Sequence, residues 1–230
     1  MKSTMITIAA ALLAAPLYAQ ESQEVTAEAP APARAADNAF ELTLGVGYAQ
    51  GFGDIGSRQR NLTDQSSAGG ELQLGAGWRI NPNFMVGLYG SGSIQDTGDY
   101  TVGSNVYTAT AGVQTNYHFL PSNTWDPWVG LGSGWRALWI NHSAGGTDSR
   151  HGIDIARFTT GVDYRVSSQF AVSPYVGAGL TTFLTQELAG EQSFSNVHSP
   201  NVNVWLFGGI QGRFDLFGNS GPSMRLASAN

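Results

Sequence analysis

The stretch VNVWLFGGIQGRFDL (Val202–Leu216) decides the fold, because every second residue in it is apolar or small. Leu206 and Phe214 share one parity, whereas the charged Arg213 falls on the other. Successive side chains of a β-strand point to opposite faces. The alternation therefore predicts a strand with one uncharged face and one face that accepts charge.

The same alternation recurs along the chain and defines eight segments. They cover residues 40–48, 72–80, 84–94, 107–119, 129–139, 156–166, 170–184 and 202–216. No position of the apolar parity carries a charge, although 12% of all residues are charged. The opposite parity carries Glu41, Glu71, Arg79, Arg136, Arg157, Asp163, Arg165, Arg213 and Asp215.

This separation of charge predicts which face meets lipid. An Arg on the lipid face near the bilayer midplane costs about 2–4 kcal/mol, whereas a charge that faces the lumen of a barrel escapes this cost. A soluble sandwich would instead carry Lys and Glu on its outer face. The polar parity here is mostly Gly, Ser, Thr, Gln and Asn, which suits the inside of a narrow barrel.

Composition supports the same class and disfavours others. The charged fraction of 12% is low against the roughly 25% of ordinary soluble domains. No stretch approaches the ~20 apolar residues that a membrane helix needs. The chain has no Cys, which removes disulfides and thiolate chemistry. Its net charge of -6 disfavours a nucleic-acid partner.

The connections between segments predict the topology. Long polar loops are expected at residues 50–70, 96–104, 141–152 and 187–200, and short turns at 81–83, 120–127 and 167–169. This strict alternation is typical of outer-membrane barrels, which have short periplasmic turns and long outward loops. The sequence therefore predicts an all-β, eight-stranded antiparallel up-and-down transmembrane β-barrel with both termini in the periplasm. Pro174 alone among the prolines falls inside a segment, where we expect a bulge or the membrane boundary.

The ends of the chain predict export. Residues 1–19 combine Lys2, an apolar run and a small residue at Ala19, as in a signal peptide. Residues 20–38 are rich in Ala, Pro and Glu and predict a flexible periplasmic lead. The barrel is expected over residues 39–217, followed by a tail over residues 218–230.

Aromatic residues gather near the ends of segments and predict two girdles at the membrane interfaces. The periplasmic girdle is expected to include Trp128, Tyr164 and Phe214. The outer girdle is expected to include Tyr107 and Trp139.

Two motifs carry a family resemblance. The stretches WVGLG (residues 128–132) and PYVGAGL (residues 174–180), together with the signal and the eight segments, resemble small eight-stranded outer-membrane barrels. The OmpW-type and OmpA-type groups of the outer membrane protein beta-barrel domain are the most similar. The resemblance covers about residues 40–217 and implies the outer membrane of a Gram-negative bacterium. The residues after Phe217 are too few for the peptidoglycan-binding domain that OmpA-like proteins often carry.

The interior of an eight-stranded barrel is just wide enough for side chains to fill or to hold one small ligand. We expect the nine charged residues to form a polar plug, with Glu41 near Arg213 and Asp163 near Arg136. A narrow conduit or a ligand pocket is the alternative. The OmpW-type resemblance implies lateral passage of small hydrophobic molecules, for which a candidate apolar ligand mouth comprises Leu138, Phe183, Trp205 and Phe207.

Catalysis is not expected, and neither is a cofactor or a metal ion. The pairs His142-Ser143 and His198-Ser199 point to opposite faces if they lie in strands, unlike the His and Ser of lipid-A deacylase barrels, to which this chain is loosely similar. The spacing of His142, His151 and His198 fits no metal motif. A lipid-modifying barrel enzyme is the least favoured reading, and a secreted lipocalin-like barrel is the non-membrane rival. The expected partners are outer-membrane lipid, lipopolysaccharide and the barrel-assembly machinery, with the protein itself a monomer.

Overall fold

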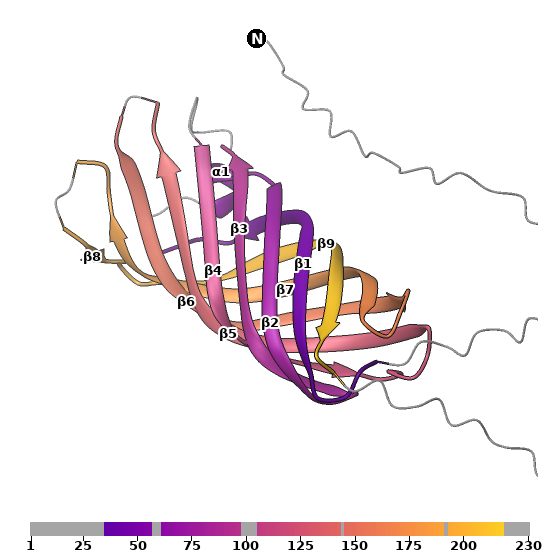
Figure 1. Cartoon of the computed structure of the whole chain (residues 1–230). Helices are drawn as coiled ribbons and strands as arrows, with labels where there is room; N and C mark the ends of the chain where they lie inside the picture. Colours follow the sequence, from indigo (N-terminus) through magenta and orange to yellow (C-terminus); the bar gives the residue numbers. More distant parts are fainter. Residues whose placement is uncertain (1–34, 57–60, 98–104, 144, 191–192, 219–230) are drawn as a thin grey trace, which may run out of the picture. The chain divides into compact units, whose positions relative to one another are not determined.

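The computed structural model describes residues 35–56, 61–97, 105–143, 145–190 and 193–218. The predicted signal peptide, most of the lead and most of the tail lie outside these residues. The described chain forms a closed antiparallel β-barrel (Figure 1). Within it, no helix is both long enough and apolar enough to cross a bilayer.

Eight long strands make the wall. They are β1 (Ala39–Phe52), β2 (Gly69–Asn81), β3 (Phe84–Asp96), β4 (Asn105–His118), β5 (Trp125–Asn141), β6 (Thr147–Arg165), β7 (Phe170–Glu187) and β9 (Val202–Leu216). Each pairs with the next, and β9 pairs with both β7 and β1, which closes the barrel. The predicted eight-stranded up-and-down architecture is confirmed.

Two small elements lie in the longer connections. The single helical turn α1 (Leu62–Gln65) sits between β1 and β2, and the two-residue strand β8 (Ser195–Asn196) adds to β7. We call the end of the barrel with these connections the loop end. The opposite end, with the connections at 82–83, 119–124 and 166–169, is the turn end.

The two parities separate as predicted. Of all positions assigned to the outer face, only Ala137 is buried. Leu88 in β3 is 62% exposed and Val176 in β7 is 61% exposed, so the apolar side chains form the outer surface. Ala137 lies between Trp135 and Trp139 along β5 and pairs with His151 of β6.

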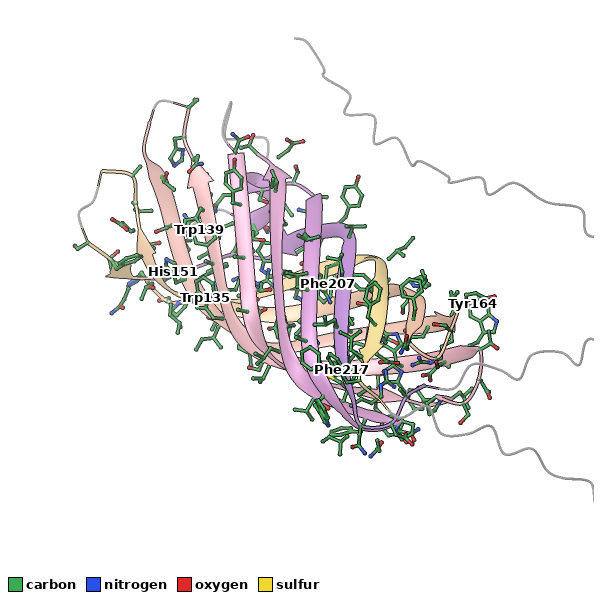
Figure 2. All side chains as sticks on the ribbon, in the orientation of Figure 1. Trp135, Trp139, His151, Tyr164, Phe207 and Phe217 are labelled. Atoms are coloured by element: carbon green, nitrogen blue, oxygen red, sulfur yellow. The ribbon has the colours of Figure 1, made fainter. Side chains whose placement is uncertain are left out.

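Those three rings cover Ala137 and belong to one aromatic cluster, seen in Figure 2. The His151 ring stacks on Trp135 at 5.6 Å between centroids and meets Trp139 edge-on at 6.1 Å. Phe194, from the connection after β7, contacts the same imidazole at 5.3 Å. The cluster therefore ties that connection to the barrel wall.

A bulge in β6 corrects the predicted loop at residues 141–152. The β5 and β6 strands run on to Asn141 and Thr147, so only residues 142–146 connect them. The register of β6 shifts between Asp154 and Ala156, where Ile155 is an extra residue. An extra residue reverses the parity of everything before it. For this reason strict alternation ends at Ala156, and the sequence predicts a loop where the strand continues.

Two prolines also differ from the prediction. Pro127 lies inside β5, opposite Val162, rather than in a turn. Pro174 keeps its register with Ile210 of β9, and the bulge expected there is absent. Instead the β6–β7 ladder is interrupted between the pairs Gly161–Tyr175 and Tyr164–Val172 without a change of register. Proline has no N–H to donate, so the ladder loses a bond but no residue is inserted.

One predicted girdle residue faces inward. Trp128 is only 2% exposed and its indole nitrogen donates to Ser173 Oγ at 2.9 Å, so it belongs to the lumen. Tyr164 and Phe214 do face outward, at 44% and 40% exposure. Trp128 has the parity of Arg136 on the same strand, which explains its position.

The wall makes a direct prediction about charge on the outer face. Leu74, near the middle of β2, is 53% exposed on that face. We expect Leu74→Arg to lower the free energy of unfolding in lipid vesicles by about 2–4 kcal/mol, because it places a charge in hydrocarbon. Urea titration of vesicle-inserted barrels measures this. Thr63→Arg, at an exposed position of α1, is the control and should change stability little. Equal effects of the two substitutions would contradict the assignment of the outer face.

Candidate functional site in the barrel lumen

The turn end of the lumen contains one connected set of ionisable side chains. We call it the turn-end network: Glu41, Arg79, His118, Asp126, Asp163, Arg165, Arg213 and Asp215. They come from β1, β2, β4, β5, β6 and β9. Every side chain in the network is at most 1% exposed.

Two carboxylates link three arginines in this network. Glu41 Oε2 accepts from Arg79 Nη2 at 2.6 Å, and Glu41 Oε1 accepts from Arg213 Nη1. Asp215 accepts from Arg165 Nη1 at 2.9 Å and lies 3.5 Å from Arg79 Nε. The predicted approach of Glu41 to Arg213 is observed, since β9 and β1 close the barrel side by side.

The remaining members gather around His118. His118 Nδ1 lies 2.8 Å from Asp126 Oδ2 and 3.8 Å from Asp163 Oδ2. Asp163 Oδ2 is also 2.9 Å from Arg213 Nε. Asp126 and Asp163 are directly opposite each other on β5 and β6, a position where like charges destabilise a sheet.

The predicted pair of Asp163 with Arg136 is therefore wrong. Arg136 instead donates twice to Asp154, from Nε at 2.8 Å and from Nη2 at 3.1 Å. Asp154 is fully buried, because the bulge at Ile155 turns it into the lumen. Asp163 lies nearer the turn end and pairs with Arg213 of β9, two strands away in the barrel.

A layer of neutral polar side chains separates the two ends. It surrounds a cavity of about 10 Å³, roughly the space of one water molecule. The cavity is lined by Thr43, Gln73, Gln114, Asn116, Trp128, Thr159 and Gln211. Amides and hydroxyls can hydrogen-bond such a water from several sides.

On the loop-end side of this layer, Arg136 and Arg157 pack against aromatic side chains. The Arg157 guanidinium lies 3.7 Å from the Phe207 ring centroid and 5.0 Å from that of Tyr89, and its Nη2 donates to Gln73 at 2.8 Å. The Arg136 guanidinium lies 4.4 Å from the Trp205 ring. Such stacking offsets part of the cost of burying a cation. Glu71, the last of the nine predicted lumen residues, is also buried.

Apolar side chains fill the loop end. The predicted mouth residues Leu138, Phe183 and Trp205 are fully buried and belong to one cluster with Ile55 and Leu62 of the first connection. Phe207 lies deeper and is 6% exposed. Arg150 Nη1 donates to Gln65 Oε1 at 2.9 Å, which links α1 to β6. The connections therefore pack onto the residues expected to form a ligand mouth.

The histidines expected in loops do not gather. His142 Nε2 pairs with Asp148 Oδ2 at 3.1 Å, His151 belongs to the aromatic cluster, and His198 is exposed. Among the described residues, the one group with several metal-binding atoms is His118, Asp126 and Asp163, whose donor atoms all lie within 4.8 Å of one another.

Sequence reasoning missed four buried polar residues of the lumen. His118 has the lumen parity on its segment but was not counted as charged. Asp126 lay in a stretch assigned to a turn, and Arg150 and Asp154 lay in a stretch assigned to a loop. The alternation continues through Pro127 back to Trp125, so a search that tolerated proline and one inserted residue would have found them.

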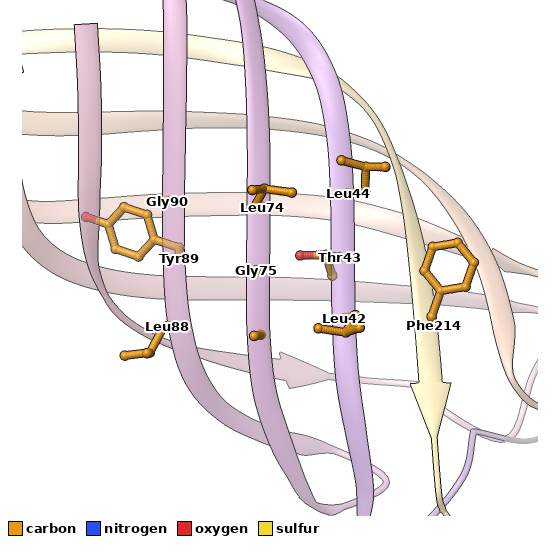
Figure 3. A pocket seen from close by; sticks show the side chains of 10 residues that line it. Leu42, Thr43, Leu44, Leu74, Gly75, Leu88, Tyr89, Gly90 and Phe214 are labelled. Atoms are coloured by element: carbon orange, nitrogen blue, oxygen red, sulfur yellow. The ribbon is translucent and has the colours of Figure 1, made fainter.

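The outer wall carries a shallow apolar hollow of about 500 Å³ across β1, β2 and β3, shown in Figure 3. Its rim includes Leu42, Leu44, Leu74 and Phe214. The hollow forms where the small outward residues Ala76 and Gly90 lie between larger ones. It belongs to the lipid-facing surface and not to the lumen.

A closed antiparallel barrel with an apolar outer surface and charge confined to its lumen defines the class of transmembrane β-barrels. The family model described as "Outer membrane protein beta-barrel domain" matches residues 6–204, and the chain belongs to this family. The family places the protein in the bacterial outer membrane. No curated protein sequence matches the chain significantly.

Solved structures of other outer-membrane proteins align with the chain. Neisserial surface protein A (NspA) aligns with a TM-score of 0.51 and 13% identity, covering 77% of this chain and 97% of that one. The outer membrane protein OprG from Pseudomonas aeruginosa aligns with a TM-score of 0.48 and 14% identity, covering 78% and 98%. At such identities the likeness to NspA shows the shared barrel fold alone.

The turn-end network should be a major source of stability for the native barrel. Removing one partner from a buried ion pair costs about 3–5 kcal/mol, because an uncompensated charge remains. We expect Arg213→Met to lower the free energy of unfolding by about this amount, measured by urea titration in vesicles.

The second variant for this measurement combines Arg213→Met with Glu41→Leu and should recover part of the loss, because it also removes a stranded charge. Asp148→Asn, at the loop-end pair with His142, should cost less than about 1 kcal/mol. If Arg213→Met lowered the free energy of unfolding no more than Asp148→Asn does, the network would not stabilise the barrel.

Proposed function

We propose that this protein is a small outer-membrane barrel with a plugged lumen and a structural or surface-interaction role. The observation that carries the proposal is the turn-end network, in which eight buried side chains from six strands meet across the barrel. A through-going pore needs a continuous wet path, and the network occupies the section where such a path would have to pass.

The middle layer and the loop end of the lumen also favour a filled lumen. The neutral middle layer leaves space for about one water molecule. At the loop end, Ile55 and Leu62 pack on Leu138, Phe183 and Trp205. A lumen filled by polar pairs at one end and apolar packing at the other favours a supporting role over conduction. No step of catalysis is proposed for these residues.

The proposal includes an orientation and partners. The loop end faces outward and both termini lie in the periplasm, since short turns are the periplasmic connections of such barrels. Ala35 donates to Pro121 in the turn at 119–124, so the chain enters the barrel at the turn end. The lipid-facing wall contacts outer-membrane lipid and lipopolysaccharide, the assembly machinery inserts the chain, and the barrel acts as a monomer without nucleic acid.

Planar-bilayer recording tests the plugged lumen. Purified full-length barrels should produce no stable current steps, because no continuous aqueous path crosses the turn-end network. A porin added afterwards to the same bilayers shows that the assay detects open channels. Large, stable steps from this protein alone would overturn the proposal.

We propose passage of small apolar molecules through the wall as the second candidate. One observation favours it: the interrupted β6–β7 ladder lies beside an outer hollow of about 470 Å³. Tyr175 lines this hollow although it is only 3% exposed and has the lumen parity. The β6–β7 ladder is thus weakened beside this hollow, where Pro174 removes a hydrogen bond.

Uptake of an apolar tracer into cells separates the two candidates. If Trp205 and Phe207 line the route, Trp205→Asp and Phe207→Asp should abolish uptake, because a carboxylate repels an apolar solute. Asn196→Asp in the exposed β8 is the matched control. Folding of each variant is checked by its gel mobility before and after heating, and unchanged uptake in folded variants would remove this candidate.

A further inference from the structure

We propose that His118, Asp126 and Asp163 bind one divalent transition-metal ion of the Zn²⁺ type at the turn end of the lumen. The site differs from the absence of metal expected from the sequence. It does not depend on whether the lumen conducts. Three neighbouring strands, β4, β5 and β6, each supply one donor side chain.

The donor set and its spacing suit such an ion. Zn²⁺ binds imidazole nitrogen and carboxylate oxygen at about 2.0–2.2 Å, and three protein ligands plus a water are a common set. His118 Nδ1 lies 2.8 Å from Asp126 Oδ2 and 3.8 Å from Asp163 Oδ2, and all donor atoms are within 4.8 Å. Atoms so spaced can reach a common ion with small side-chain movements.

An independent observation is the state of Asp163. Its side chain is fully buried, and its partners are the Arg213 guanidinium and the Ser173 hydroxyl. Arg213 Nε approaches Oδ2 at 2.9 Å, but this contact is an ion pair whose N–H does not point at the oxygen. A carboxylate has about four acceptor positions, so Asp163 keeps unused ones, and leaving them unserved in a buried site is costly unless a cation binds there.

The charge of the network leads to the same inference. It contains four carboxylates but only three guanidiniums, so one negative charge is unmatched when His118 is neutral. Asp126 and Asp163 also face each other across the ladder. A cation between them converts this repulsion into attraction.

A proton on His118 is the alternative to a metal ion, but it would serve only one of the two aspartates. It would serve Asp126 at 2.8 Å, but Asp163 at 3.8 Å lies beyond hydrogen-bond range and would gain no bond from that proton. A metal ion serves both carboxylates. Arg213 keeps Glu41 as a partner if Asp163 turns toward the ion.

The experiment uses the full chain folded in detergent micelles with Zn²⁺ and then dialysed against a weak chelator. Metal analysis should find about one zinc per barrel. Asp163→Asn and His118→Gln should each reduce the retained zinc at least tenfold. Asp163→Asn is nearly isosteric and removes the unmatched charge, so we expect it to fold, as gel mobility before and after heating will show.

The matched control is the double variant His142→Gln and Asp148→Asn, which deletes the accessible His–Asp pair at the loop end and should retain zinc. Co²⁺ in place of Zn²⁺ provides a second readout, since X-ray absorption should show one imidazole and carboxylate oxygens. The proposal is overturned if wild type retains no zinc, if Asp163→Asn retains as much as wild type, or if the control variant loses it. If the barrel holds no zinc and nitrogen NMR shows that both ring nitrogens of His118 are protonated, a proton and not a metal ion occupies the site, and the proposal is wrong.

Discussion

The exclusion of charge from the hydrocarbon is the constraint on which the rest of the structure depends. A membrane wall tolerates few charged side chains, so the ionisable residues of the strands point inward. Inside a barrel of eight strands there is little water to solvate them. Each charge must therefore find a partner inside the lumen, either on a neighbouring strand, as Arg79 does with Glu41, or on a strand further round the barrel, as Arg165 does with Asp215.

This need explains how the lumen is layered. The turn-end network joins six strands at the end of the lumen that has the short turns. The arginines above it are stabilised by rings as well as by carboxylates, as Arg157 is by Phe207. At the loop end the charges give way to apolar side chains, and the first connection packs down on them through Ile55 and Leu62. The charged lumen, the apolar wall and the packing of the first connection are thus parts of one solution.

The bulge at Ile155 shows how a local irregularity serves that solution. In a regular strand without the bulge, Asp154 would share the parity of Phe158 and face lipid. With it, Asp154 turns inward and meets Arg136. The same insertion hid the first half of β6 from sequence reasoning, which depends on strict alternation. An acidic residue on the lipid parity of a strand is therefore a signal for a bulge.

The sequence by itself determined the wall: the number of strands, the apolar outer face and the nine charged residues of the opposite parity all follow from alternation, which is a local property of the chain. The pairing of those charges was decided only by the tertiary structure. Which residues face each other across a lumen depends on the stagger of strands, on bulges and on closure by β9 and β1. For this reason Glu41 with Arg213 could be foreseen from closure alone, whereas His118 with Asp126 and Arg136 with Asp154 could not.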